Sequence, residues 1–439
     1  MRLSPTINKA ITYLNETELG KRLFKGVSWT LIGSVSGKLL QLISFIIVAR
    51  IIGKEDYGQL GIIRSTIAMF LMFSTLGMGM TASRYIALYR NTEPQYAYKI
   101  YKFSYQVTLI FALIISLVII SFSESISLHA FNNRLLEKPL IISTFVLFFM
   151  SITSIQSGAL NGFENFKAIG INSTINGIIQ LVLVVFAAYY FNIYGVIGAL
   201  GVSYIVLFIQ LQISLKKNIQ TLKNEQSESN EKISLRSIFI NFSLPAVLSG
   251  LVTVPTLWWA KTLLIKSNGF GEMAIYDVAE QWYYVILFIP GALSSIILPL
   301  LTNTTVEGTK GEYRSLIKVN LAINIIITGI LAIFVAIFSP FIYKMYGPGF
   351  NNIIPLIVLL VSAVICAGNN VLGQIIASKG KMWIGLIVNM IWGVWLVLFS
   401  TIFIDKMNLG AAGLAYAILA SYLLHSVTQA YVAIRVKLF

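Results

Sequence analysis

Basic side chains lie inside two successive apolar stretches of this chain, and they are the residues best suited to bind an anion. Lys38 falls near the middle of the stretch 28–50, and Arg64 falls in the first turns of the stretch 60–80. A Lys or Arg at the centre of a bilayer costs roughly 2.5 to 3.5 kcal/mol on insertion scales, so such residues usually face a water-filled interior. We therefore expect Lys38 and Arg64 to meet an anionic group inside the protein.

Polar residues, joined in one case by the aromatic Phe45, recur at helical spacing within the apolar stretches. The sets that share a helical face are Ser34, Lys38, Gln41 and Phe45, then Asn172, Asn176 and Gln180, and the pairs Asn320 with Asn324 and Asn370 with Gln374. Buried amides of this kind either line a binding surface or join helices by hydrogen bonds of under about 2 kcal/mol each. The amides of Gln41, Asn172, Asn176 and Gln180 are the candidates for binding a polar substrate beside Lys38 and Arg64.

Two acidic residues, Asp277 and Glu280, lie at the start of the apolar stretch 275–301. They could titrate and couple transport to H⁺ or Na⁺, pair with Lys or Arg, or lie in an interfacial first turn near the positive end of the helix dipole. Arg50 and Lys261 are close to the ends of their stretches, and we expect them to extend to the membrane interface.

The composition identifies the class of protein that carries these residues. The chain is 57% hydrophobic and 11% charged, with a mean hydropathy of +0.80 over 439 residues, which describes a polytopic membrane protein. A helical span needs about 20 apolar residues. We expect twelve spans, at about 28–50, 60–80, 103–122, 140–160, 169–190, 195–215, 237–262, 275–301, 317–339, 351–377, 383–404 and 410–433. Residues 1–26 contain no apolar core of a signal peptide.

The distribution of basic residues predicts the orientation. With the N-terminus in the cytoplasm, the cytoplasmic segments hold 22 of the 32 Lys and Arg residues, and both termini are cytoplasmic. The positive-inside rule accounts for most of the net charge of +15, so we do not expect nucleic-acid binding.

The spans form two groups of six. We expect a cytoplasmic N-terminal segment at 1–26, an N-terminal lobe at 27–215, a polar cytoplasmic linker at 216–236 and a C-terminal lobe at 237–439. Four glycine pairs share an offset of 215 residues, namely Gly158 with Gly373, Gly170 with Gly385, Gly195 with Gly410, and Gly198 with Gly413. Such a repeat predicts two similar lobes around a central cavity that opens on alternate sides.

Motifs of the common enzyme classes are missing from the sequence. It has no G-x-x-x-x-G-K-[ST] loop, no H-E-x-x-H motif and no paired cysteines, because Cys366 is the single cysteine. We therefore expect neither an enzyme nor an ATP-driven pump, and no metal or cofactor apart from a coupling H⁺ or Na⁺.

The residues 24–90 carry a family resemblance, sharpest at ARIIGKEDYGQL after the first span. With the six-plus-six plan, they resemble the polysaccharide flippases of the multidrug/oligosaccharidyl-lipid/polysaccharide exporter (MOP) superfamily, and in particular O-antigen flippases of the Wzx type. The resemblance extends over essentially the whole chain, but the signature is diffuse and has no invariant catalytic motif.

This resemblance implies an all-α membrane protein of the MATE type in a bacterial inner membrane. It also implies movement of an undecaprenyl-pyrophosphate-linked oligosaccharide, an O-antigen or similar repeat unit, from the cytoplasmic to the periplasmic leaflet. Lys38 and Arg64 would supply the cationic lumen thought to serve such relatives, and other polysaccharide-assembly proteins are expected partners. The alternatives are a MATE-like drug or organic-cation antiporter, and a membrane polysaccharide polymerase or ligase.

Overall fold

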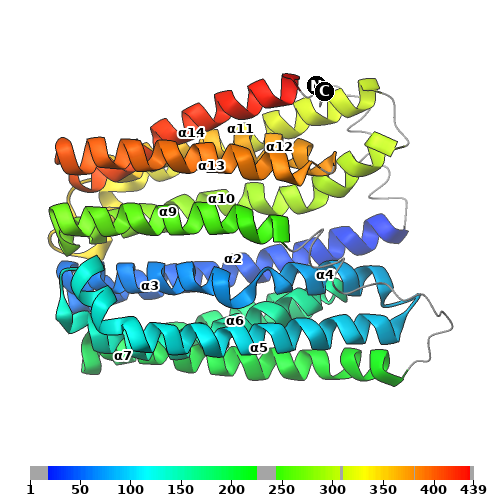
Figure 1. Cartoon of the computed structure of the whole chain (residues 1–439), viewed down its shortest axis with the longest axis horizontal. Coiled ribbons are helices and arrows are strands. Elements are labelled where there is room, and N and C mark those ends of the chain that lie inside the picture. Colours follow the sequence, from blue (N-terminus) through cyan, green and yellow to red (C-terminus); the bar gives the residue numbers. More distant parts are fainter. Residues whose placement is uncertain (1–17, 225–243, 307–309, 380, 436–439) are drawn as a thin grey trace. The chain divides into compact units, whose positions relative to one another are not determined.

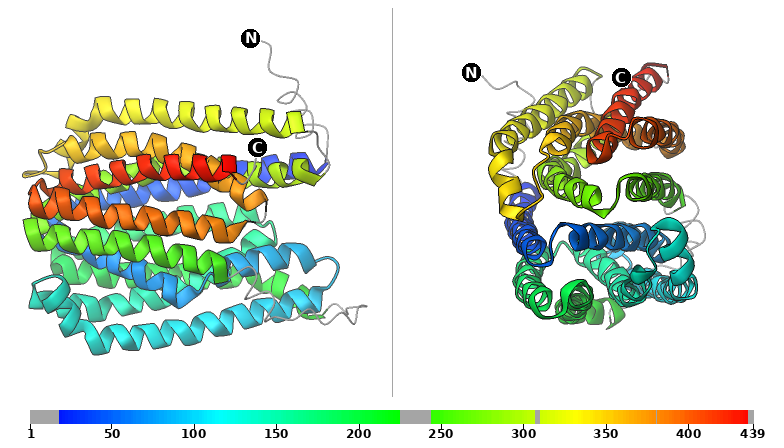
Figure 2. Two further views of the ribbon diagram at one scale, coloured as in Figure 1. Left: turned by 45° about the horizontal axis from the view of Figure 1, so that its top comes forward. Right: turned by 90° about the vertical axis from the view of Figure 1, so that its left-hand side faces the viewer.

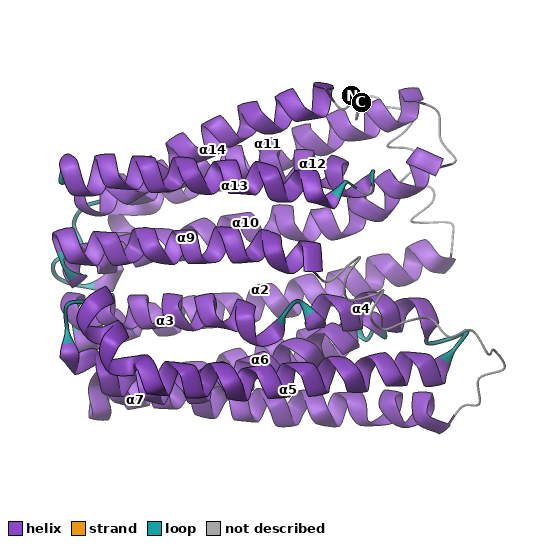
Figure 3. Ribbon diagram, viewed as in Figure 1, coloured by secondary structure: helices purple, strands orange, loops and turns teal. Residues whose placement is uncertain are grey.

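The computed structural model describes residues 18–224, 244–306, 310–379 and 381–435. These residues form helices joined by short loops, and they contain no strand (Figure 3). Two compact units can be distinguished, Arg22–Val254 and Pro255–Phe439, and the second also includes the described residues 18–21. Figure 1 labels the helices, and the views in Figure 2 show that those within each unit run side by side.

The first unit is built from α2 to α7 and the second mainly from α9 to α14. The helices of the first unit are α2 (Glu18–Ile52), α3 (Lys54–Thr75), α4 (Met78–Tyr89), α5 (Pro94–Ser125), α6 (Glu137–Gly162) and α7 (Phe166–Asn224). Those of the second are α9 (Leu244–Asn268), which begins in the first unit, α10 (Phe270–Val306), α11 (Lys310–Tyr346), α12 (Ile354–Ser378), α13 (Met382–Ser400) and α14 (Gly410–Arg435). Short π- or 3₁₀-helical turns are η1 (Ile126–Ala130), η2 (Arg134–Leu136) and η4 (Thr401–Lys406).

The predicted membrane spans fall on these helices. Among the described residues, nine helices are long and apolar enough to cross a membrane, or ten if α3 and α4 together make one span. The long helix α7 covers two predicted spans, 169–190 and 195–215. The predicted all-α membrane fold is therefore confirmed, with a helix count close to the expected twelve. Residues 237–243 of the seventh predicted span lie outside the described part of the chain.

The second predicted span, 60–80, is broken rather than continuous, which corrects the prediction of a single helix. Leu76 and Gly77 both have positive φ, 45° and 67°, and the axes of α3 and α4 differ by 48°. Glycine adopts this backbone without steric penalty, so Gly77 permits the break, while Leu76 is an uncommon residue there. The hydroxyls of Ser74 and Thr75 donate to the carbonyls of Phe70 and Leu71 in the last turns of α3, and such side-chain bonds often accompany a helix bend.

A second break lies inside α7. Asn192 has φ 50° and ψ −146°, so two helical arms meet there. Asparagine tolerates positive φ better than most residues. The second arm continues to Asn224, so the first part of the predicted linker 216–236 is helical, and residues 225–243 lie outside the described chain. The predicted domain boundaries remain a prediction.

Each unit has an apolar core of its own. In the first unit, α4, α5, α6 and α7 meet at a cluster that includes Met78, Ile155 and Leu211. In the second, α11, α12 and α14 meet around Tyr313, Ile375 and Ala433. Large apolar side chains are also exposed along these helices, as lipid contact in a membrane requires.

Candidate functional site

The polar residues of the first unit are placed by a close contact between α2 and α7. A Cβ added to Gly33 would overlap the backbone of Gly170, and one added to Gly37 would lie 2.6 Å from the carbonyl oxygen of Ser173. Small residues let membrane helices approach at backbone distance. The hydroxyl of Thr174 donates to the carbonyl of Gly33 at 3.2 Å and so fixes the register of the two helices.

This register brings together two of the predicted binding residues. Gln41 Nε2 donates to Gln180 Oε1 at 3.4 Å, across α2 and α7. Asn176 lies one turn before Gln180, and within the described chain Asn176 Oδ1 and Gln180 Nε2 are buried without a hydrogen-bond partner. Lys38 directly follows Gly37 on α2 and is exposed. The α2–α7 contact thus lies close to three amides, and Lys38 is one turn from Gln41 on α2.

Asn172 is engaged elsewhere. Its side-chain nitrogen donates to the Ser214 hydroxyl at 3.0 Å, which ties the two arms of α7 together. A second bond of this kind joins Gln156 Nε2 to Gln212 Oε1 at 2.9 Å, between α6 and α7. Helical spacing in the sequence did not distinguish Asn172, which bonds to Ser214, from the candidate binding residues Gln41 and Gln180.

Arg64 of α3 is half-buried and lies over an aromatic ring of α2. Its guanidinium carbon is 3.9 Å from the centre of the Phe45 ring, and Tyr204 of α7 lies within electrostatic reach. Phe45 is 1% exposed. A guanidinium against an aromatic face is a cation–π contact, which holds the charge without neutralising it. Lys38 and Arg64 therefore lie on α2 and the helix packed against it.

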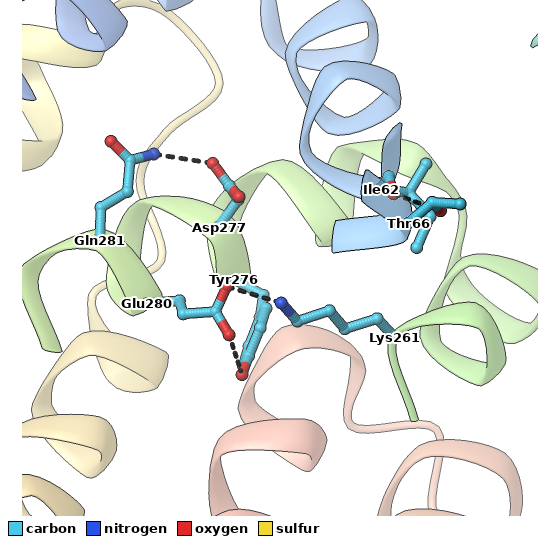
Figure 4. Close-up of polar contacts among 7 residues, drawn as sticks. All are labelled: Ile62, Thr66, Lys261, Tyr276, Asp277, Glu280 and Gln281. Atoms are coloured by element: carbon cyan, nitrogen blue, oxygen red, sulfur yellow. Dashed lines mark hydrogen bonds and ion pairs between the residues drawn. The ribbon is translucent and has the colours of Figure 1, made fainter. Parts of the chain in front are cut away.

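The second unit contains a buried ion pair, shown in Figure 4. Lys261 Nζ of α9 lies 2.6 Å from Glu280 Oε2 of α10. The Tyr276 hydroxyl donates to the other Glu280 oxygen at 3.2 Å, and the Tyr276 ring lies under the Lys261 ammonium at 5.6 Å. One turn away, Gln281 Nε2 donates to Asp277 Oδ2 at 2.7 Å.

These positions correct one prediction and select among others. Lys261 does not extend to the interface as predicted, because it is 6% exposed and paired with Glu280. Asp277 and Glu280 do not lie in a first turn, because α10 begins at Phe270. Of the roles considered for Glu280, pairing with a basic residue is the one seen in the structure.

A third cluster of polar side chains lies in the second unit, and the sequence predicted only some of its members. Asn320 Nδ2 donates to Gln374 Oε1 at 3.1 Å, joining α11 to α12. On α12 it is Asn369, not the predicted Asn370, that is buried, and it donates to the carbonyl of Tyr422 while accepting from the Ser426 hydroxyl. Across the described parts of both units, no three His, Cys, Asp or Glu residues gather as metal ligands.

Comparison with known proteins gives the family. The family described as "Polysaccharide biosynthesis protein" matches residues 23–305 of the 439-residue chain. The chain belongs to this family. Among its relatives, the EPS I polysaccharide export inner membrane protein EpsE of Ralstonia solanacearum is 28% identical over 192 residues, which are 42% of each chain. The match thus spans less than half the length of EpsE. The capsular polysaccharide biosynthesis protein CapF of Staphylococcus aureus is 23% identical over 90% of this chain and 96% of CapF.

Solved structures of other proteins have the same fold as this chain. A multidrug resistance MATE family transporter of the MOP superfamily, in an inward-facing conformation, superposes with a TM-score of 0.77 over 91% of this chain and 94% of that chain. An outward-facing structure of such a transporter gives 0.72 over 98% of both chains. At 16% identity these similarities show the fold alone. The chain therefore has the fold of MOP-superfamily transporters, as its sequence predicted.

Proposed function

We propose that this protein is a flippase for a polyprenyl-pyrophosphate-linked oligosaccharide, which it moves from the cytoplasmic to the periplasmic leaflet of a bacterial inner membrane by alternating access. The proposal rests on α2, where Lys38 is one turn from Gln41, which bonds to Gln180, and where Phe45, one turn further on, packs against Arg64 of α3. Family membership and the printed roles of EpsE and CapF, polysaccharide export and capsular polysaccharide biosynthesis, support a glycan as cargo.

The chemistry of the first unit suits such a substrate. Lys38 and Arg64 bind phosphate oxygens in place of water, and the guanidinium can do so with two parallel hydrogen bonds. The amides of Gln41, Asn176 and Gln180 donate to and accept from sugar hydroxyls. The polyprenyl tail stays in lipid, since transferring it into a polar site would expose apolar surface to water.

The membrane potential favours this direction of movement. With both termini in the cytoplasm, as the basic residues indicate, the anionic head group leaves a negative interior. The membrane potential contributes about 2.3 kcal/mol of favourable free energy per charge per 100 mV to this movement. Asp277 is a candidate for binding a coupling H⁺ or Na⁺ in addition.

The proposal is tested in liposomes that contain the purified protein and an undecaprenyl-pyrophosphate-linked glycan. We expect the wild type to expose the glycan to an external glycosidase, faster under an imposed potential, and Lys38→Ala and Arg64→Ala to slow this exposure at equal protein levels. Lys99→Ala is the matched control, because Lys99 is an exposed lysine of α5 outside the proposed site. Undiminished rates in both site variants contradict the cationic site, and lengthening of the glycan without movement indicates a polymerase.

A further inference from the structure

Both oxygens of the Glu280 carboxylate have a bonding partner, Lys261 on one and Tyr276 on the other. The two oxygens accept from the Lys261 ammonium at 2.6 Å and from the Tyr276 hydroxyl at 3.2 Å. Both members of the pair are buried, Lys261 being 6% and Glu280 8% exposed. The pair lies wholly within the unit Pro255–Phe439, on α9 and α10 (Figure 4).

Neither charge can lose its partner alone. Removal of one member of a buried ion pair leaves an uncompensated charge in a poorly solvated environment, which is strongly unfavourable. If Lys261 binds a different anion, Glu280 must therefore become neutral by taking up a proton. If Glu280 takes up a proton, Lys261 must find another anion or water.

Among the described residues around Glu280, Lys261 is its charge partner. Tyr276 of α10 donates to the Glu280 carboxylate, and Tyr284 lies one turn further along the same helix. Behind these tyrosines lie Tyr422 of α14, near Tyr276, and Cys366 of α12, near Tyr284. From α11, the Tyr343 hydroxyl donates to the carbonyl of Ile275. Phenols and a thiol are uncharged at neutral pH. Asp277, three residues before Glu280, accepts from Gln281.

We propose that Lys261 is a second anion-binding residue, which exchanges the Glu280 carboxylate for a phosphate oxygen of the substrate while Glu280 binds one proton. The inference rests on the proposed function, because the anion is the phosphate-bearing head group of that substrate. The step is balanced: one proton adds to a carboxylate oxygen, the Lys261–Glu280 contact is replaced by an ammonium–phosphate contact, and the pair changes from net charge zero to +1 opposite one ligand charge.

The exchange couples the binding of the anion to the binding of a proton, and this coupling is favourable. Each ligand strengthens the binding of the other, and the linkage is reciprocal. A proton at Glu280 therefore travels with the anion and not against it, so the net charge moved is smaller by one. Transport of a cation in the direction opposite to the anion would need a different carboxylate, such as Asp277, to carry that cation.

The binding experiment uses the purified full chain in detergent, titrated calorimetrically with farnesyl diphosphate or inorganic diphosphate from pH 6 to 8. Buffers of different ionisation enthalpy give the number of protons taken up per ligand. For the wild type we expect uptake of about one proton more per ligand than in Glu280→Gln, which corrects for the ionisation of the diphosphate itself. Relative to that variant, the affinity should weaken with rising pH by at most about tenfold per unit. Response to inorganic diphosphate shows that the anion suffices, and response to farnesyl diphosphate alone shows that the prenyl tail is also needed; both support the exchange.

Three variants separate this role from a structural one. Glu280→Gln should bind both probes but take up about one proton fewer per ligand than the wild type, because its amide cannot titrate; the pH dependence that remains is that of the diphosphate itself. Lys261→Met should bind at least tenfold more weakly. The double variant Lys261→Met/Glu280→Gln removes both charges, so it should keep the thermal stability of the wild type and still lack the proton uptake linked to Glu280.

The control is Glu124→Gln, which makes the same change in the exposed Arg134–Glu124 pair (2.7 Å) and should leave proton uptake at the wild-type value. Equal proton uptake in the wild type and Glu280→Gln, or unchanged pH dependence in Glu280→Gln, overturns the exchange. The proposed function is judged separately by glycan movement in liposomes. Movement without the proton uptake linked to Glu280 refutes only the exchange, whereas absence of movement refutes the flippase.

Discussion

The guanidinium carbon of Arg64 lies 3.9 Å from the centre of the Phe45 ring, so a charge on one apolar helix rests against an aromatic face on its neighbour. Phe45→Leu keeps the apolar bulk but removes that face. A cation–π contact contributes about 0.5 to 2 kcal/mol, which corresponds to a roughly 2- to 30-fold slower translocation if Arg64 must be held in place for phosphate binding. The measurement is the initial rate of glycan movement in liposomes.

Two further variants make this result specific. Phe45→Tyr retains a ring and should lose little activity. Phe334→Leu makes the same substitution at an exposed ring on α11, and it should leave the rate unchanged. Equal losses in Phe45→Leu and Phe334→Leu would show that the Arg64 contact has no part in transport.

The close approach of α2 and α7 predicts a stability difference between two glycine variants. A Cβ at Gly33 would overlap the backbone of Gly170, whereas a Cβ at Gly198 has no atom within 4 Å. Overpacking a helix contact typically costs about 1 to 3 kcal/mol, while Ala in an open helical position is neutral or stabilising by up to about 1 kcal/mol. We expect Gly33→Ala to unfold several degrees below the wild type in detergent and Gly198→Ala at or above it. Similar unfolding temperatures for the two variants would contradict this helix contact.

The sequence was a good guide wherever one helix determined the outcome. Apolar runs of about 20 residues located the spans, because a membrane leaves the backbone few alternatives to a helix. Helical spacing likewise placed Gln41 on a face with Lys38, and Asn176 on a face with Gln180. The polar residues gathered at the α2–α7 contact could therefore be identified as candidates from their spacing.

The sequence was a poor guide wherever two helices had to meet in a particular register. Lys261 and Glu280 belong to different helices joined at Gly269, and their contact depends on how α9 and α10 pack after this turn. The choice between Asn369 and Asn370 depends on the rotation of α12, which apolar runs do not specify. Both Phe45 and Arg64 were identified separately, yet their contact was not predicted.

Glu272 supports a helix terminus that lay outside the predicted sites. Its Oε2 atom accepts from the backbone N–H of Ala411 at 2.8 Å, at the start of α14, where Gly410 has φ 56°. A carboxylate at this position satisfies an otherwise unpaired amide and interacts favourably with the helix dipole. We expect Glu272→Ala to lower the free energy of unfolding by about 0.5 to 2 kcal/mol. The check is thermal unfolding in detergent, with Glu137→Ala in the first turn of α6 as a control that should change less. An unchanged unfolding temperature for Glu272→Ala would remove this capping role.

The Gln41–Gln180 and Gln156–Gln212 pairs provide a test of binding against helix joining within one unit. The two pairs have the same chemistry, at 3.4 and 2.9 Å, but the first includes Gln41, which is one turn from Lys38 on α2. Side-chain hydrogen bonds between membrane helices average about 0.6 kcal/mol, so Gln180→Leu and Gln156→Leu should both unfold close to the wild type. If Gln180 binds sugar hydroxyls, Gln180→Leu should slow translocation about tenfold or more, because an unpaired polar group of the substrate is then left in the site. Gln156→Leu should keep the wild-type rate. Equal rates in the two variants would mean that both pairs only join helices, and the binding surface would then have to be sought elsewhere around Lys38 and Arg64.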